Sequence, residues 1–471
     1  MASDSSIAAQ SSTTAVDTIV AVSTPPGRSG IGIVRLSGPL AIAIADDLVR
    51  LRQPLEHGRA RLADVVDAES AEPPDRIDEA VVTWFAAPNS YTGEDVVEIA
   101  AHGSPVVLEM LLRGAIARGA RLAEPGEFTE RAFLAGRIDL TQAEAVRDLI
   151  EAQTLTQARQ AASQMGGALS RRVRPVKQAL VELIALLEAG IDFAEDDVDV
   201  APETEIARRI DGVRAPLIAL EATFARGSIV HDGLTLAIVG RPNAGKSSLF
   251  NRLVERDRAI VTATPGTTRD TISERISLDG IPLELVDTAG LREAGDEAEQ
   301  LGVARSREAL ADASLVLIVL DATHPLNEEE RRLFEAVQDR PAIIARNKCD
   351  LTIGGAANDG SLPGSECNIP ALATSALTGE GIAQLREKIV ALATGGAASE
   401  PGLLTNLRQH QAITGALNAL DDAARANASR IPHEMILLDL YRALGGLDSL
   451  TGQTTSDDVL NLIFSTFCIG K

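Results

Sequence analysis

The order of hydrophobic and polar residues divides the chain into stretches with different periods. Near the N-terminus, short apolar runs at 18–22, 31–36, 80–85 and 96–100 are separated by turn-forming residues and by segments with helical spacing, one of which predicts a helix over residues 39–51. Residues 1–16 are rich in Ser, Ala and Thr and are predicted to be a disordered tail. The pattern predicts a compact α+β domain over residues 17–135.

Apolar residues recur at helical spacing from about residue 136 onward. Over 176–187 they form one stripe, which consists of Ala179, Leu180, Leu183, Ile184 and Leu187. Ala-rich helical patterns continue to residue 230 and predict an α-helical bundle. A helical pattern returns over residues 396–471, after a linker of small residues.

Between the two helical stretches, strand-like and helix-like segments alternate. The apolar runs lie at 234–239, 282–286, 315–320, 342–345 and 371–373. Strands that alternate with helices are typical of a parallel sheet covered by helices. The sequence therefore predicts an α/β domain over residues 233–393.

Composition and charge limit the classes of function. The chain has 471 residues, of which 45% are hydrophobic and only 3% aromatic, so its cores must consist of aliphatic side chains. The net charge of −23 argues against a general nucleic-acid coat, although a local basic patch stays open. Three cysteines are too few for a disulfide framework, and neither a secretion signal nor a membrane-spanning run is present. We expect a soluble cytoplasmic protein that has no membrane association.

The stretch Gly240–Ser248 reads Gly-Arg-Pro-Asn-Ala-Gly-Lys-Ser-Ser and follows an apolar run. It matches the phosphate loop G-x-x-x-x-G-K-[ST], whose backbone N–H groups surround phosphate oxygens. We expect Lys246 to reach the β- and γ-phosphates and the Ser247 hydroxyl to bind Mg²⁺. The alternative is a glycine turn between a strand and a helix that binds nothing.

Further motifs follow at the ends of later strands. Asp287-Thr288-Ala289-Gly290 suits the Mg²⁺ shell and the γ-phosphate. The carboxylate of Asp350, in Asn347-Lys348-Cys349-Asp350, can accept from guanine N1–H and N2–H₂, which adenine lacks. Together the motifs predict a GTPase domain. The predicted GTP-binding residues are Asn243, Ala244, Gly245, Lys246, Ser247, Ser248, Thr262, Thr267, Thr268, Asp287, Thr288, Ala289, Gly290, Asn347, Lys348, Asp350, Ser375, Ala376 and Leu377.

The residue after the Asp-x-x-Gly motif is Leu291, where a Ras-type GTPase has the glutamine that orients water. Another group must therefore activate the water. Acidic candidates follow at Glu293, Asp296, Glu297 and Glu299, and spacing alone does not choose among them.

Arg35 and Glu98 are charged residues in apolar strand settings. Alternation alone favours strand residues on a solvent-facing side. Arg137 could equally be a surface charge.

Several motifs together resemble the bacterial tRNA-modification GTPase family MnmE, also called TrmE. They are Pro-Pro-Gly-Arg at 25–28, the segments at 88–95 and 125–133, the GTPase motifs, and the terminal Cys468-Ile469-Gly470-Lys471. The resemblance implies a multidomain fold with an α+β N-terminal domain that binds folate and dimerises. It also implies a helical domain made of 136–230 and 396–471, with an α/β Ras-like P-loop GTPase domain inserted.

The resemblance further implies that K⁺ activates GTP hydrolysis when two GTPase domains of a homodimer meet. The implied K⁺ ligands are Asn243, Thr262, Thr264 and Thr267, where Asn243 supplies a carbonyl oxygen. Mg²⁺ would use Ser247 and Thr268. Glu299 would be the catalytic acid that activates water through a bridging water molecule.

For the N-terminal domain, the resemblance implies that Arg35, Glu98, Arg137 and Lys471 bind 5-formyltetrahydrofolate. Cys468 is either a functional thiol or a small hydrophobic residue. The implied reaction adds a carboxymethylaminomethyl group to carbon 5 of the wobble uridine of tRNA, with the flavoprotein MnmG (GidA) as the partner that carries FAD. A regulatory switch that only gates partner binding is the competing reading.

Overall fold

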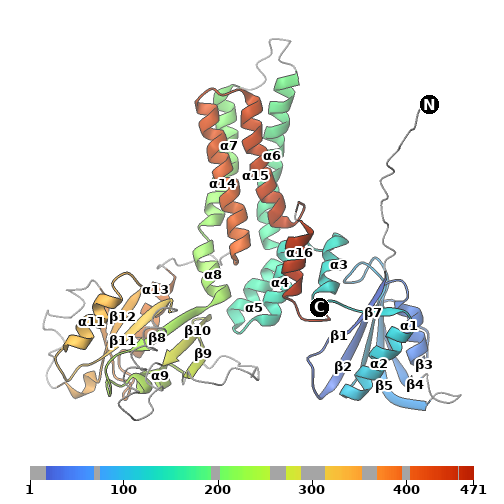
Figure 1. The fold of residues 1–471 in the computed structure, drawn as a ribbon, viewed down its shortest axis with the longest axis horizontal. Helices are drawn as coiled ribbons and strands as arrows, with labels where there is room; N and C mark the ends of the chain where they lie inside the picture. The colour runs from blue at the N-terminus through green and yellow to red at the C-terminus, as the bar shows by residue number, and fades with distance from the viewer. Residues whose placement is uncertain are drawn as a thin grey trace, which may run out of the picture. The chain divides into compact units, whose positions relative to one another are not determined.

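The computed structural model describes residues 17–67, 75–192, 202–254, 272–287, 313–352, 369–394, 404–454 and 456–470 (Figure 1). The chain divides into two compact units, Met1–Glu144 with Thr454–Lys471, and Ala145–Gln453.

The first unit is built around a seven-stranded sheet of order β3-β4-β5-β6-β2-β1-β7, in which only β1 and β7 pair in parallel. Alternate strand residues face α1 and α2 and form one apolar core. A predicted helix over residues 39–51 ends earlier, because Val49–Leu51 pairs with β4. The strands are β1 (Thr18–Val22), β2 (Ser29–Ser37), β3 (Val49–Leu51), β4 (Ala60–Asp67), β5 (Asp75–Phe85), β6 (Val96–Gly103) and β7 (Ala120–Leu122), and the helices are α1 (Ala41–Leu48), α2 (Pro105–Ala117) and α3 (Glu127–Leu134).

The end of the chain belongs to this first unit rather than to the helical bundle. Helix α16 (Asp457–Ser465) contacts α3, and the rings of Phe133 and Phe464 lie 6.3 Å apart. Ile469 forms an antiparallel bridge with Pro125. The boundaries proposed from the sequence place residues 396–471 together, and the structure adds that the last part of this range folds on the N-terminal unit.

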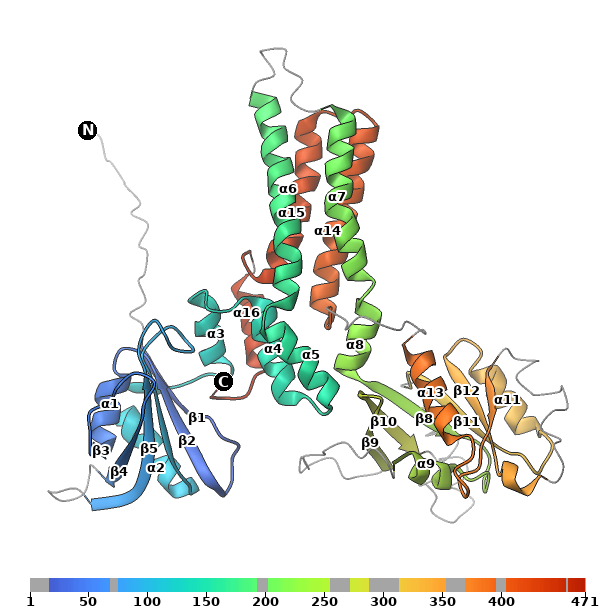
Figure 2. The same ribbon diagram turned by 180° about the vertical axis from the view of Figure 1, so that it is seen from behind.

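In the second unit, four helices share one apolar core (Figure 2). They are α6 (Ala168–Asp192), α7 (Glu203–Glu221), α14 (Leu407–Ala428) and α15 (His433–Thr451). The predicted stripe of α6 contributes Leu180, Leu183, Ile184 and Leu187 to this core. Shorter helices α4 (Leu140–Glu151), α5 (Leu155–Met165) and α8 (Phe224–Asp232) complete the helical part. Because α7 and α14 come from opposite sides of the α/β segment, that segment is an insertion in the helical domain.

The inserted domain has a six-stranded sheet of order β13-β12-β11-β8-β10-β9. Neighbouring strands from β13 to β10 are parallel, whereas β9 is an antiparallel edge strand that the sequence analysis did not predict. Helices α9 and α13 pack with one apolar cluster and α11 with another. The elements are β8 (Leu234–Val239), α9 (Lys246–Val254), β9 (Ile272–Leu278), β10 (Ile281–Asp287), β11 (Leu315–Asp321), α11 (Glu328–Ala336), β12 (Ala342–Asn347), the 3-10 turn η2 (Cys349–Leu351), β13 (Ala371–Ala373) and α13 (Ile382–Ala393). The predicted multidomain fold class is confirmed.

Within the described ranges, no helix is both long enough and apolar enough to span a membrane. The same residues contain no group of three or more His, Cys, Asp and Glu side chains arranged to hold a metal ion.

Candidate functional site

The phosphate loop joins β8 to α9, as the sequence predicts. Gly240 has φ of 148°, and a Cβ there would lie 2.2 Å from the carbonyl oxygen of Val319. Only glycine fits, because the loop turns directly against β11. Lys246 begins α9, and Ser247 and Ser248 follow on its exposed first turn. A helix N-terminus with this orientation favours an anion.

Lys246 is folded over its own loop. Its side chain is buried, and Nζ donates hydrogen bonds to the carbonyl oxygens of Gly240 (2.7 Å) and Arg241 (2.9 Å). These bonds satisfy the ammonium without a ligand. A phosphate group could take their place, since charge-assisted bonds to an anion are stronger than bonds to neutral carbonyls.

Asn347, at the end of β12, is 2% exposed and connects two loops to its own strand. Its Nδ2 donates to the carbonyl oxygen of Ala244 (3.0 Å), and its Oδ1 accepts from the backbone N–H of Ala376 (3.0 Å). Both ends of this buried amide are therefore used. The residue fixes the phosphate loop and the Ser375-Ala376-Leu377 loop relative to each other.

Lys348 makes a second connection to the phosphate loop. Its backbone is left-handed, with φ of 66°, and its Nζ donates to the carbonyl oxygen of Asn243 (2.7 Å) and to Oδ2 of Asp321 (2.7 Å). Burial works to raise the pKa of Asp321, but hydrogen bonds from Lys348 and Thr323 hold that pKa well below its usual range. Sequence reasoning missed Asp321. It ends the apolar strand β11, as Asp287 ends β10 and Asn347 ends β12, and that position could have identified it.

Two loops, after β12 and after β13, carry the other residues that are predicted to read the guanine base. Asp350 lies in η2 with an exposed side chain, and the N–H of Cys349 donates to Thr374 O (3.1 Å), which joins η2 to the next loop. Ser375 is fully buried and its Oγ accepts from the N–H of Thr378 (3.1 Å), whereas Leu377 is 82% exposed. The exposed carboxylate of Asp350 is therefore accessible to a base.

Other predicted residues of the nucleotide site fall outside what the structure describes. Asp287 ends β10 beside Ile238 of β8, but the structure describes only its backbone. The following lie outside the described residues: Thr262, Thr264, Thr267, Thr268, Thr288, Ala289, Gly290, Leu291 and Glu299.

In the first unit, the structure brings Arg35, Glu98 and the end of the chain together. Arg35 Nε donates to Glu98 Oε1 (2.9 Å), and Nη1 donates to the carbonyl oxygen of Gly470 (3.2 Å). The Ser23 hydroxyl donates to the same oxygen (3.1 Å). The guanidinium also lies 5.6 Å from the ring centre of the buried Phe128. Arg35 and Glu98 thus form a half-buried ion pair rather than two separate solvent-facing charges.

Residues 468–470 of the terminal motif are held by backbone contacts next to Arg35. Gly470 has φ of 92°, and a Cβ there would lie 2.7 Å from the carbonyl oxygen of Val22, so its backbone approaches β1 directly. The N–H of Gly126 donates to Cys468 O (3.4 Å), while the free thiol of Cys468 is exposed. Arg137 lies exposed after α3, and among the described residues no hydrogen bond joins its side chain to Arg35. Lys471 lies outside the described residues.

Comparisons with known proteins find similar sequences over nearly the whole length of this chain. The family model described as the MnmE helical domain matches residues 140–468, and the model described as the GTP-binding protein TrmE N-terminus matches residues 18–137. A tRNA modification GTPase MnmE from Koribacter versatilis is 59% identical over 460 residues, which cover 97% of this chain and 99% of the relative. The chain belongs to the MnmE family of tRNA modification GTPases. The relative of that name from Aquifex aeolicus is 40% identical over 454 residues, covering 96% of this chain and 99% of its own.

A solved structure is also similar to this MnmE-family chain. It is the G domain of the T. maritima FeoB iron transporter, with 29% sequence identity and a TM-score of 0.26. The match covers 34% of this chain and 98% of that one.

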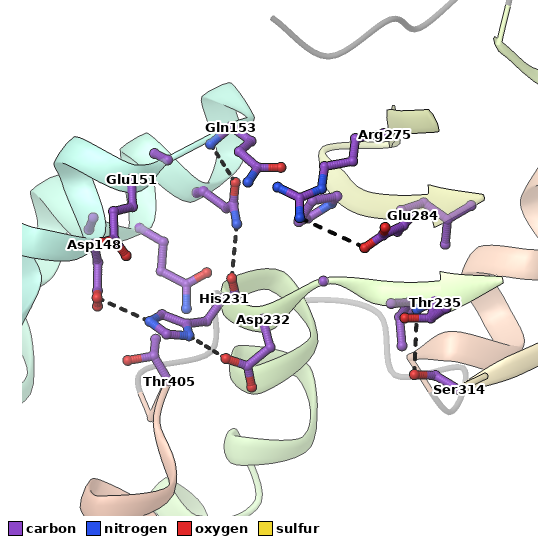
Figure 3. Close-up of a pocket in the computed structure, with 18 of the residues that line it drawn as sticks. Asp148, Glu151, Gln153, His231, Asp232, Thr235, Arg275, Glu284, Ser314 and Thr405 are labelled. Atoms are coloured by element: carbon purple, nitrogen blue, oxygen red, sulfur yellow. Dashed lines mark hydrogen bonds and ion pairs between the residues drawn. The ribbon is translucent and has the colours of Figure 1, made fainter. Parts of the chain in front are cut away.

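A polar cavity of about 240 Å³ lies within the second unit of this MnmE-family chain, away from the predicted site residues (Figure 3). Asp148 of α4, His231 and Asp232 of α8, and Arg275 and Glu284 of β9 and β10 line it. His231 lies between Asp148 Oδ1 (3.1 Å) and Asp232 Oδ1 (2.7 Å). The close contact with the Asp148 carboxylate raises the pKa of His231 to about 9. His231 is therefore a cation at neutral pH.

Proposed function

We propose that this protein hydrolyses GTP, with K⁺ as activator, in order to modify carbon 5 of the wobble uridine of tRNA, together with the flavoprotein MnmG. The product would carry a carboxymethylaminomethyl group, and a folate would supply the one-carbon unit. Membership of the MnmE family supports the tRNA-modifying role. The observation that carries the nucleotide part is the pair of bonds by which Asn347 and Lys348 hold the phosphate loop.

These bonds support a single site in which both the phosphates and the base would be bound. In the proposed complex, the Lys246 ammonium leaves the Gly240 and Arg241 carbonyls for the β- and γ-phosphates. Ser247 contributes a hydroxyl to Mg²⁺. Asp350 accepts the two guanine donors, for which its exposed position is suitable.

A contact of Lys348 favours one oxygen of Asn243 as the proposed K⁺ ligand. The backbone carbonyl of Asn243 already accepts the Lys348 ammonium, and a second cation on the same oxygen would be repelled. The side-chain amide oxygen of the exposed Asn243 is therefore the proposed ligand. When bound, K⁺ would supply positive charge where charge develops on the phosphates. Thr262, Thr264 and Thr267 are its other proposed ligands.

Leu291 has no group that can orient water, and the resemblance to the MnmE family makes Glu299 the proposed water-activating acid. Thr268 remains the second proposed Mg²⁺ ligand. Dimerisation is proposed because a K⁺ site closed between two GTPase domains would activate each of them.

A folate is the proposed ligand of the first unit. The Arg35 guanidinium is half-buried, lies against an aromatic ring and is already oriented by Glu98. Such an arginine suits a planar, polar ligand that carries carboxylates. Arg137 and Lys471 are proposed to add further positive charge. Cys468 is proposed as an accessible thiol beside this site, because it is free and exposed.

The proposed compartment is the cytoplasm, because the described cysteines Cys349 and Cys468 are free thiols. The proposed partner MnmG would bring FAD and most of the cationic surface for tRNA, since this chain has a net charge of −23.

GTP hydrolysis measured in K⁺ and in Na⁺ at equal ionic strength tests this proposal. K⁺ should raise the turnover number at least tenfold, and the Asn243→Ala variant should lose that difference while it still binds GDP. Equal turnover in both salts would reject the K⁺ site. No hydrolysis in either salt, with normal GDP binding, would reject the catalytic assignment instead.

A further inference from the structure

Asp321 lies where the parallel strands of the inserted domain end, next to the loops of the proposed nucleotide site. It is the last residue of β11, which is flanked by β8 and β12. β8 leads to the phosphate loop and β12 ends at Asn347. The carboxyl ends of parallel strands meet at one edge, so Asp321 lies between the two loops. Its side chain is only 6% exposed.

The two carboxylate oxygens of Asp321 have separate partners. Oδ1 accepts from the Thr323 hydroxyl (2.6 Å) and the Thr323 N–H (3.0 Å). Oδ2 accepts from Lys348 Nζ (2.7 Å). Thr323 therefore fixes the orientation of the carboxylate, and the carboxylate fixes the ammonium.

The same ammonium donates to the carbonyl oxygen of Asn243 in the phosphate loop at 2.7 Å. Lys348 is 32% exposed and has a flexible stem, so ordering it costs conformational entropy. The hydrogen bond to the buried Asp321 carboxylate offsets this entropy cost in the folded protein, before any nucleotide binds. The phosphate loop is then held in place in advance.

We propose that Asp321 is a positioning residue for guanine-nucleotide binding: it holds Lys348 on the Asn243 carbonyl and so couples the base-reading loop to the phosphate loop. This inference rests on the proposed nucleotide site. Asp321 acts through Lys348 and does not itself contact the nucleotide.

The substitution Asp321→Asn separates this role from simple packing, because it keeps the size of the side chain. The amide has one acceptor oxygen and one donor NH₂. If the oxygen keeps the Thr323 donors, the NH₂ opposes the Lys348 ammonium. If the amide is reversed, the NH₂ opposes the Thr323 N–H. In either orientation, one donor of the cluster loses its acceptor.

The test is the dissociation constant of a fluorescent GDP analogue, measured with the full-length chain for Asp321→Asn, Lys348→Met, the double variant and the control Asp339→Asn. Asp339 carries an exposed carboxylate just before β12, at the end of that strand opposite to Asn347. We expect each single variant to bind about tenfold more weakly. The double variant should be no weaker than Lys348→Met alone, because both changes remove one coupled contact. The control should bind like the wild type.

Two results would overturn the inference while they leave the proposed role of Lys348 intact. One is wild-type affinity in Asp321→Asn together with weak binding by Lys348→Met. The other is a double variant whose loss equals the product of the two single losses, which would show that Asp321 acts independently of Lys348. Wild-type affinity in Lys348→Met would instead reject the proposed role of Lys348 in the nucleotide site, and the inference with it. If Asp321→Asn does not fold, Asp321→Ser is read in the same cycle with the same outcomes.

Discussion

The protonation of His231, in the cavity between the helices and the sheet of the second unit, should make the stability of the protein depend on pH. The imidazole contacts Asp148 and Asp232, and its pKa is raised from 6.5 to about 9. The folded state therefore prefers the protonated ring. The contacts of the protonated His231 ring contribute fully to stability below about pH 6.5, and this contribution is lost as the pH rises through about 9.

The size of this effect follows from the pKa and the exposure of the partners. Each pKa unit corresponds to about 1.4 kcal/mol, so the upper limit is about 3 kcal/mol. The Asp148 side chain is 7% exposed, but that of Asp232 is 67% exposed, so water screens the second contact. We therefore expect about 1–2 kcal/mol of stabilisation at pH 6 relative to pH 9.5.

Two measurements check this expectation. NMR titration should show one histidine with a pKa near 9 that disappears in the His231→Gln variant. Calorimetry should show that this variant is less stable than the wild type at pH 6, and that the gap narrows by about 1–2 kcal/mol at pH 9.5. The control is His433→Gln, since His433 makes no ion pair with a described residue. A pKa at or below 6.5, or a gap that does not change with pH, would refute the reasoning.

Four further variants probe the proposed sites. Asn347→Ala should weaken GDP binding about tenfold or more, because the buried carbonyl of Ala244 and N–H of Ala376 both lose a partner; a titration that gives wild-type affinity contradicts this. Asp350→Asn should shift preference from guanine towards xanthine nucleotides, and unaltered GTP affinity counts against base reading. Glu299→Ala should keep GTP binding and abolish hydrolysis, so near-normal turnover would exclude it as the water-activating acid. Arg35→Met should weaken binding of 5-formyltetrahydrofolate at least tenfold by calorimetry, and unchanged binding would remove Arg35 from the folate site.

Much of the inserted domain could be predicted because its central strands β8, β11 and β12 are buried on both faces. Apolar runs such as Leu315–Asp321 are visible without any tertiary information. Edge strand β9 was missed because its sequence, Ile-Ser-Glu-Arg-Ile-Ser-Leu, lacks a continuous apolar run. The three residues of β3 were predicted to be helical, because only their pairing with β4 makes them a strand. Short and edge strands depend on their partners, which the local sequence does not show.

The candidate nucleotide site was predictable to the extent that its residues form local motifs. The bonds of Asn347 and Lys348 to the phosphate loop, and the role of Asp321 beside them, depend on contacts between segments far apart in the chain. The Arg35–Glu98 pair is similar, since register in the sheet places the two residues opposite each other. Spacing could identify each charge but not its partner. The return of Gly470 to β1 likewise depends on tertiary packing.

The central claim, that GTP hydrolysis by this protein serves modification of the wobble uridine, is tested most directly by mass spectrometry of tRNA nucleosides. A strain that lacks the gene should lose the carbon-5 modification. The wild-type gene should restore it, whereas the Lys246→Ala variant, which removes the ammonium from the phosphate loop, should not. Unchanged wobble uridines in the deletion strain would contradict the account.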